Sequence, residues 1–229
     1  MTEDAFARRV TRVGSLADPV RRALYRFVSA QPDAVSRDQA ADGVDVPRHT
    51  AKFHLERLVD EGLLVPEFRR LTGRSGPGAG RPAKLYRRAR KEVSVSVPSR
   101  RYDLAGQVLA DAVERALDGA PMNEAVTDAA QQAAADAVHN AKPTGKDLAR
   151  VAGVLADYGY EPQIDEDHGD LTLGNCPYDR LAAEHQELVC GMNLDFVRAV
   201  ADRLGCDGDR VELAPDPPRC CVRVLAPSK

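Results

Sequence analysis

Tryptophan is absent from this 229-residue chain, and aromatic residues make up only 5% of it. Hydrophobic residues nevertheless make up 43%, so we expect cores built from leucine, valine and alanine. The chain lacks any apolar run of roughly 18 residues, the length that a membrane-spanning helix needs. Its start, Met1 to Arg9, is charged and has no apolar segment of the signal-peptide type. We therefore expect a soluble, cytoplasmic protein with no membrane contact.

Cysteine is missing from residues 1–175, and all five cysteines fall in residues 176–229. In a reducing compartment thiols seldom form disulfides and more often have metal-binding or redox roles. The C-terminal part of the chain therefore holds the candidate thiol chemistry. A Ser/His/Asp order, a phosphate-binding loop and a nucleotide-binding fingerprint are also missing, so we do not expect an enzyme.

Charge divides the chain in a similar way. Residues 1–101 hold 21 basic and 12 acidic side chains, a net charge of +9. Residues 102–229 hold 11 basic and 23 acidic side chains, a net charge of −12. A basic half joined to an acidic half indicates that one half meets a polyanion and the other does not.

The basic half contains the signals of a helix-turn-helix. Asp18-Pro19 is typical of a helix start, and a helix is predicted to follow it up to Ser29. Ser36 and Gln39 form a capping box for a short helix that Gly43 should stop. After a tight turn, a second helix is predicted over Pro47–Glu61. Two helices joined in this way are the pattern that places a recognition helix in the DNA major groove.

The second helix has two distinct faces. Apolar residues at helical spacing (Ala51, Leu55 and Leu58) should pack inward. The opposite face carries Arg48, His49, Lys52 and Phe53, and we add the neighbouring Thr50 to the candidate DNA contacts. Arginine and lysine can read guanine edges, and phenylalanine can contact a thymine methyl group. The alternative is an ordinary solvated helix face, but the segment that follows favours DNA binding.

That segment is predicted to be a basic β-hairpin. Residues 63–68 read as a strand whose Pro66 requires an edge position, and residues 84–87 read as the return strand. Between them lies a loop rich in glycine, proline and arginine. A hairpin of this kind after a helix-turn-helix is typical of a wing, in which arginine can enter the adjacent minor groove. Its candidate DNA contacts are Arg69, Arg70, Arg74, Arg81 and Lys84.

Four segments carry a family pattern: Leu16–Pro19, His49–Leu55, Glu61–Leu64 and Gly80–Tyr86. Together they resemble the ArsR/DeoR-type winged-helix bacterial transcription regulators over roughly residues 10–92. The resemblance implies a homodimer that binds a near-palindromic operator on double-stranded DNA and represses transcription.

Residues 93–145 are predicted to form a linker followed by helices for dimerisation. Residues 93–98 alternate as a short strand or an extended linker would. The next helix carries an apolar stripe that can pack on its own domain or form a dimer seam: Leu104, Val108, Leu109, Ala112, Val113 and Leu117. An alanine-rich helix follows over residues 123–140.

Residues 146–229 are predicted to form an α+β sensor domain. A helix over residues 145–158 is followed by a β-hairpin at 162–173, one long helix or two over 180–204, and strands at 210–213 and 220–225. The fold class is therefore α+β with antiparallel strands: a winged helix-turn-helix domain (1–92), a helical linker and dimerisation segment (93–145), and a sensor domain (146–229).

The cysteines of this domain do not have the paired C-x-x-C spacing of a structural zinc site. Cys220 and Cys221 should point to opposite faces of a strand, and Cys206 is interpreted as a small buried hydrophobic residue. The segment from Asn175 to Asn193, with Cys220-Cys221, is similar to relatives of the iron–sulfur-biogenesis repressor, the Suf regulator.

The resemblance implies that Cys176, Cys190 and Cys220 hold an iron–sulfur cluster whose loss changes operator affinity. Cys221 and His185 are additional candidate ligands. Thiolates suit zinc equally well, so zinc, a small organic effector and the absence of any cofactor remain alternatives.

Overall fold

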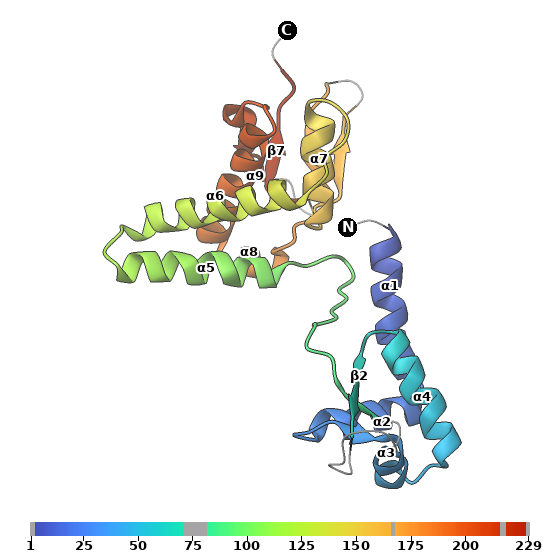
Figure 1. Ribbon diagram of the computed structural model, residues 1–229. Helices are drawn as coiled ribbons and strands as arrows, with labels where there is room; N and C mark the ends of the chain where they lie inside the picture. Colours follow the sequence, from blue (N-terminus) through green and yellow to red (C-terminus); the bar gives the residue numbers. More distant parts are fainter. Residues whose placement is uncertain (1–2, 71–81, 166–167, 216–218, 228–229) are drawn as a thin grey trace. The chain divides into compact units, whose positions relative to one another are not determined.

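The computed structural model describes residues 3–70, 82–165, 168–215 and 219–227. The chain forms two compact units, one ending at Val95 and the other beginning at Ser96 (Figure 1). Helices and antiparallel sheets occur in both, so the predicted α+β class is confirmed. The wing residues Arg74 and Arg81 lie outside the described residues.

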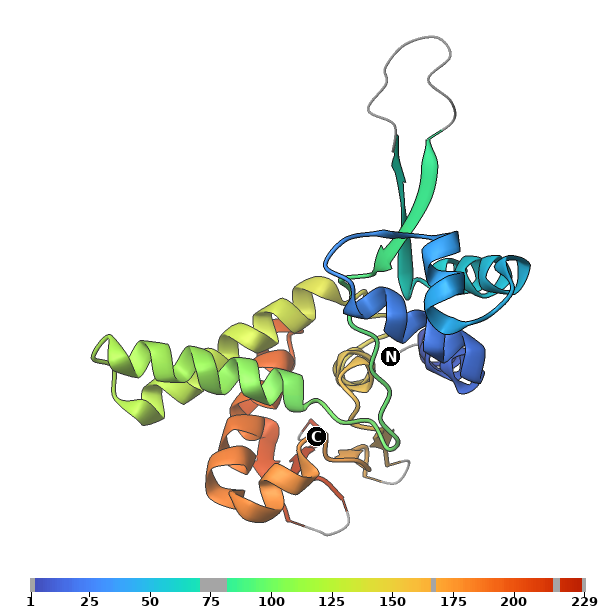
Figure 2. The ribbon, with the colours of Figure 1, turned by 90° about the horizontal axis from the view of Figure 1, so that it is seen from below.

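The N-terminal unit consists of α1 (Glu3–Gly14), η1 (Ser15–Ala17), α2 (Pro19–Ala30), β1 (Val35–Ser36), α3 (Arg37–Val44), α4 (Arg48–Asp60), β2 (Leu64–Arg69) and β3 (Ala83–Arg88). Its antiparallel sheet has the order β1-β3-β2. Figure 2 shows β2 and β3 as the two arms of a hairpin that extends away from the helices of this unit. The predicted helix-turn-helix and hairpin are confirmed, whereas α1 and β1 were not anticipated.

Local signals place these elements as predicted. The Asp18 side chain caps α2 by accepting a hydrogen bond from the backbone N–H of Arg21, and Ser36 and Gln39 form the capping box of α3. Pro66 lies in the edge strand β2, where its missing N–H removes no hydrogen bond from the centre of the sheet. Side chains of α2, α3 and α4 then meet in one apolar core: Leu24, Val28, Ala40, Ala41, Ala51, Leu55 and Leu58.

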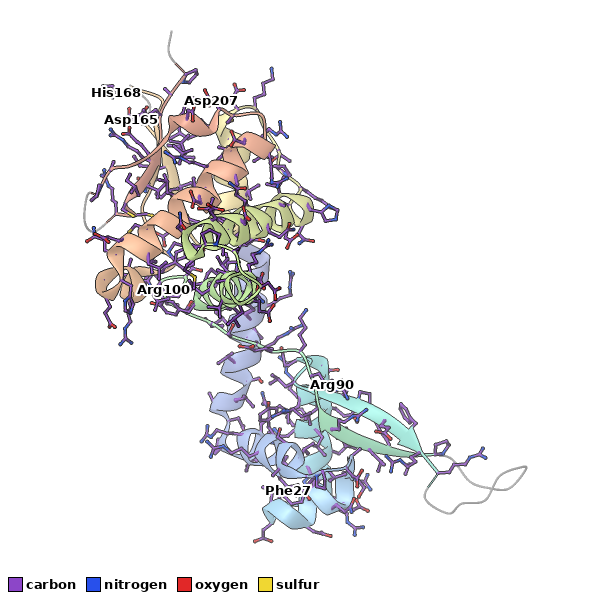
Figure 3. The ribbon with its side chains drawn as sticks, turned by 90° about the vertical axis from the view of Figure 1, so that its left-hand side faces the viewer. Phe27, Arg90, Arg100, Asp165, His168 and Asp207 are labelled. Atoms are coloured by element: carbon purple, nitrogen blue, oxygen red, sulfur yellow. The ribbon has the colours of Figure 1, made fainter. Side chains whose placement is uncertain are left out.

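Gly43 does not end α3, contrary to the sequence-based expectation. The helix continues to Val44 and ends at Asp45, which adopts the left-handed conformation with φ 54°. The ring of Phe27 in α2 (Figure 3) packs directly over Gly43, and a Cβ atom there would lie only 2.1 Å from the Cε2 atom of that ring. Glycine is therefore required at this position by close packing between α2 and α3.

Glu56 connects α4 to the hairpin. Its carboxylate accepts hydrogen bonds from Lys84 Nζ (2.5 Å) and from the Tyr86 hydroxyl (2.7 Å), both in β3. Burial alone would raise the pKa of Glu56, but the bonds from Lys84 and Tyr86 outweigh burial and lower it. Burial and the bond to Glu56 raise the pKa of Tyr86, so this hydroxyl remains a donor.

The C-terminal unit consists of α5 (Tyr102–Leu117), α6 (Met122–Asn140), α7 (Leu148–Asp157), β4 (Pro162–Ile164), β5 (Leu171–Leu173), α8 (Asp179–Glu184), α9 (Gln186–Arg203), η2 (Gly208–Arg210), β6 (Val211–Leu213) and β7 (Val222–Val224). Its antiparallel sheet has the order β4-β5-β7-β6. Helices α7 and α9 pack on this sheet, α6 packs on α9, and α5 packs on α6. The break between α8 and α9 falls at His185.

The segments predicted as a dimerisation region and as a sensor domain share one core in this structure. Alanines along α6, including Ala129, Ala130 and Ala134, are fully buried, and their small side chains let α5 and α9 approach closely from two sides. Residues 93–98 form no strand. The stripe on α5 divides: Leu104, Val108 and Ala112 are buried against their own unit, whereas Val113 and Leu117 are exposed.

We expect Gly43→Ala to destabilise the N-terminal unit by about 1–3 kcal/mol, the usual cost of inserting a methyl group into a filled core. Urea denaturation followed by circular dichroism measures this change. Gly14→Ala is the matched control, because a Cβ atom at Gly14 meets nothing within 4 Å and its backbone is already right-handed helical. Equal stability of the two variants would show that Phe27 does not require the glycine.

We expect Glu56→Gln to lower the free energy of unfolding by up to about 1 kcal/mol at pH 7, a small value because the Lys84–Glu56 pair is about one-third exposed. Since the folded-state pKa of Glu56 lies below its usual 4.5, this stabilisation is complete above pH 4.5 and is lost as the pH falls through the folded value. The free energies of unfolding of the variant and the wild type should therefore become equal at acidic pH. The exposed Glu92→Gln serves as control, and a pH-independent difference would contradict the assignment.

Candidate nucleic-acid interface and cysteine site

Helix α4 presents the predicted recognition face to solvent. Arg48, His49, Lys52 and Phe53 are exposed, and Thr50 is half-buried between them. Phe53 is 65% exposed, although it is among the largest apolar side chains of the unit. The N-cap of α4 is a proline whose side chain makes no capping hydrogen bond, so backbone N–H groups of the first turn are available to an anion. This face can therefore contact both base edges and phosphate.

A shallow groove of about 540 Å³ runs along this face. Its lining includes two arginines that were not predicted from the sequence, Arg21 of α2 and Arg57 of α4. Arg21 is positioned by His54, a buried residue of α4 whose Nδ1 accepts a hydrogen bond from Arg21 Nε at 3.4 Å. The spacing of apolar residues does not reveal this pair, because it joins residues 33 positions apart.

Several of the predicted DNA contacts have acidic partners in the structure. Arg48 lies 3.6 Å from Asp38, Arg69 lies 2.6 Å from Glu67, and Lys84 lies 2.5 Å from Glu56. Arg70 follows β2 and is exposed. Exposed ion pairs of this kind contribute only about 0–1 kcal/mol, so a DNA phosphate can replace the acidic partner of Arg48 or Arg69 at low cost.

Four of the five cysteines come together in the C-terminal unit. Cys176 precedes α8, Cys190 lies within α9, and Cys220-Cys221 precedes β7. Three pairs of these thiols are close enough for one sulfur to affect the pKa of its neighbour: Cys176 and Cys220, Cys220 and Cys221, and Cys190 and Cys221. Cys220 is buried with the core-facing Val222 and Val224, whereas Cys221 is only half-buried, in agreement with the predicted alternation. We call these four residues the cysteine cluster.

The pKa values of three thiols in the cysteine cluster, those of Cys176, Cys190 and Cys220, are raised. The hydrogen bond to Cys220, followed by burial, strongly raises the pKa of Cys176, and burial raises the pKa of Cys190. Cys176 lowers the pKa of Cys220, but Cys221 and burial together outweigh this effect and raise the pKa to about 11. The Cys220 sulfur also accepts a hydrogen bond from Asn193 Nδ2 at 3.2 Å, and Asn193 is fixed in turn by the Tyr160 hydroxyl.

The other two candidate residues lie apart from this chemistry. His185 is exposed at the break between α8 and α9. Cys206 is buried, and the charged groups that affect its pKa are Arg210, Asp147 and Arg150 rather than another cysteine.

The donor set of the cysteine cluster suits a thiophilic metal or an iron–sulfur cluster, because sulfur is the ligand that both prefer. Across the part of the chain that the structure describes, however, no group of three or more His, Cys, Asp or Glu side chains is arranged to hold a metal ion. The cysteine cluster therefore has the right donor atoms for such a cofactor, but in this structure its side chains are not arranged as a metal site.

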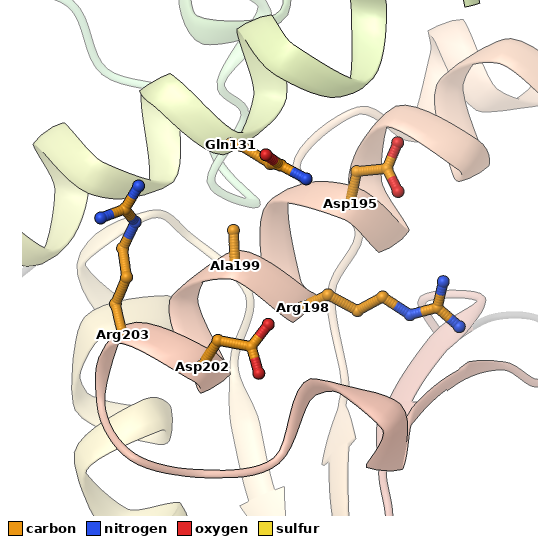
Figure 4. Close-up of a pocket in the computed structure, with 6 residues that line it drawn as sticks. All are labelled: Gln131, Asp195, Arg198, Ala199, Asp202 and Arg203. Carbon is orange, nitrogen blue, oxygen red and sulfur yellow. The ribbon is translucent and has the colours of Figure 1, made fainter. Parts of the chain in front are cut away.

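A pocket between α6 and α9 offers no second candidate site (Figure 4). Three of its polar side chains already have structural partners. Asp195 accepts a hydrogen bond from Thr127 at 2.8 Å, Asp202 accepts one from the backbone N–H of Gly208 at 2.7 Å, and Arg198 donates to the Val211 carbonyl at 3.1 Å. These side chains stabilise the packing of α9 and the segment after it.

Comparison with known proteins agrees with the geometry of the N-terminal unit. Residues 16–67, from η1 to the middle of β2, match the model of a helix-turn-helix domain family. No curated protein and no solved structure matches the chain. Within the described residues, no helix has the length and apolar character needed to cross a membrane. The matched helix-turn-helix domain and the exposed face of α4 together support a DNA-binding transcriptional regulator.

Proposed function

We propose that this protein is a dimeric repressor whose affinity for a near-palindromic operator changes with the state of its cysteine cluster. The proposal rests on the observation that one chain contains both of two features. A basic unit exposes a polar recognition face on α4, and an acidic unit brings four cysteines close together. The expected cytoplasmic location is compatible with both.

In this proposal α4 enters the major groove. Arg48 and Lys52 contact guanine edges, His49 and Thr50 contact a base or a phosphate, and Phe53 contacts a thymine methyl group. Arg21 reaches the backbone from the side of the groove. The hairpin contacts the neighbouring minor groove and phosphates through Arg69, Arg70 and Lys84, with Arg74 and Arg81 proposed to act in the same way.

The dimer partner is a second copy of the chain. At the turn between α5 and α6, Val113, Leu117 and Met122 are 46%, 81% and 52% exposed, so the apolar stripe of α5 continues beyond what its own unit buries. One helix-turn-helix reads one half-site, and two copies are needed to read a near-palindrome. We therefore assign this exposed end of the α5–α6 hairpin to the contact between two copies.

The cysteine cluster is the proposed effector site. Cys176, Cys190 and Cys220 are the proposed thiolate ligands, with Cys221 as the fourth donor in place of the exposed His185. A bound iron–sulfur cluster supplies sensitivity to oxidants and to iron supply, whereas zinc supplies structural cross-linking alone. Burial keeps Cys176, Cys190 and Cys220 neutral when no metal is bound, and Cys221 is half-buried beside them. A small organic effector is the remaining alternative, and we do not propose enzymatic activity.

We expect Arg48→Ala and Lys52→Ala each to weaken operator binding by about 1–3 kcal/mol, roughly 5- to 150-fold, because each removes a contact to a base edge. Fluorescence anisotropy with a selected operator measures the change. Arg26→Ala is the matched control, since Arg26 is an exposed arginine of α2 outside the groove. Wild-type affinity in both α4 variants would refute the recognition face.

We expect Leu117→Glu to convert the dimer into a monomer, because a buried carboxylate at an apolar contact is costly. Sedimentation velocity distinguishes the two states. Leu213→Glu changes an apolar side chain that is also partly exposed, at 46%, but lies in β6 away from this hairpin, and it should leave the dimer intact. A Leu117→Glu variant that remains dimeric would place the contact elsewhere.

We expect protein isolated without oxygen to contain iron and sulfide, with broad visible absorbance, or zinc without colour. Cys176→Ser and Cys190→Ser should lose most of the bound metal, because each removes a thiolate ligand. Cys206→Ser should retain it, since Cys206 lies outside the cysteine cluster. Metal and sulfide analysis of the wild type and the three variants measures these losses. Wild-type protein that contains neither iron nor zinc would refute the proposal that the cysteine cluster binds a metal.

A further inference from the structure

The segment that connects the two units is fastened to the loop that carries Cys176. Asn175, which is only 7% exposed, is the centre of this attachment. Its side-chain oxygen accepts a hydrogen bond from Arg100 Nη1, and its Nδ2 donates to the backbone carbonyls of Ser99 (2.8 Å) and Gly159 (2.6 Å). Arg100 is labelled in Figure 3. One buried amide therefore joins the connecting segment, the Cys176 loop and the end of α7.

The residues that follow Cys176 hold the same segment. The backbone N–H of Arg101 donates to the carbonyl of Pro177 at 3.0 Å, and the guanidinium of Arg100 lies 3.5 Å from Asp179. The Arg101 guanidinium also stacks over the ring of Tyr158, 4.8 Å from its centroid. Cys176 is thus flanked on both sides by residues that grip the connecting segment.

The packing at this attachment leaves no free space. Gly159 has φ +87°, and a Cβ atom there would lie 2.6 Å from the Ser99 hydroxyl. The connecting segment is therefore seated against the turn after α7 as well as bound to the Cys176 loop.

We infer that Asn175 and Arg100 form a latch that holds the connecting segment, and that the state of Cys176 sets how firmly the latch holds. This inference rests on the proposed function of the cysteine cluster as the effector site. A ligand gained or lost at Cys176 displaces the loop between Asn175 and Asp179, and the same loop makes the contacts that hold Ser99–Arg101.

The latch has a direct consequence for DNA affinity. Residues 89–98 continue covalently from the latch to β3 of the DNA-binding unit. A held segment acts as a short tether, which raises the effective concentration of the second recognition helix once the first has bound its half-site. Release of the segment lengthens that tether, so the affinity gained by binding both half-sites at once becomes smaller.

Hydrogen exchange measured by mass spectrometry tests the first step without any bound metal. We expect the amide of Arg101, which donates to the Pro177 carbonyl, to exchange at least about ten times faster in Cys176→Ser than in Cys206→Ser, a matched change of another buried cysteine. Equal exchange in the two variants overturns the inference, because it shows that Cys176 does not affect the latch.

Operator binding by latch variants tests the second step. Asn175→Ala and the milder Arg100→Gln, which leaves both bonds from Asn175 Nδ2 in place, should weaken binding to a two-half-site operator about ten-fold. Binding to a single half-site should not change. If Arg100→Gln matches the wild type on both DNAs, the latch does not act on DNA binding. That result would leave the recognition face of α4 standing, since Arg48→Ala and Lys52→Ala test it separately.

Discussion

The burial of Ala51, Leu55 and Leu58, each 0% exposed, fixes the rotation of α4 about its own axis. These three side chains pack against α2 and α3, so the residues between them in the helical repeat must point outward. Arg48, His49, Lys52 and Phe53 are outside for that reason, and the hydrogen bonds of Glu56 to β3 place the hairpin beside the same helix. If α4 were turned about its axis by one residue position, a lysine would be buried and apolar core side chains would be exposed.

The structure of the C-terminal, acidic unit depends on a different constraint. It carries most of the acidic residues of the chain, so it is unsuited to DNA, and it brings three buried cysteines and the half-buried Cys221 close together. Burial makes ionisation of Cys176, Cys190 and Cys220 costly, which keeps these thiols neutral when no metal is bound. In our inference, the position of Cys176 next to Asn175, which binds the connecting segment, links the acidic unit to the basic one.

The sequence was sufficient wherever a local rule decided the structure. Helical spacing identified the two faces of α4, a proline placed β2 at the sheet edge, and strand alternation separated buried Cys220 from half-buried Cys221. It was insufficient wherever distant segments meet. The close approach of Phe27 explains Gly43, and the Arg21–His54 pair and the latch at Asn175 join residues far apart in the chain. The place of α5 and α6 in the core of the acidic unit depends on small alanine side chains, which carry little periodic signal.

The most direct test of the account is photocrosslinking from α4 to duplex DNA. A benzophenone amino acid in place of Phe53, an aromatic side chain that is 65% exposed, retains the size and character of the site. We expect a DNA adduct from this position at low ionic strength, and none from the same probe at Ile164, a 45% exposed residue of β4 in the acidic unit. An adduct from Ile164 alone, or no adduct from either position while the protein binds DNA, would contradict the proposed role of α4.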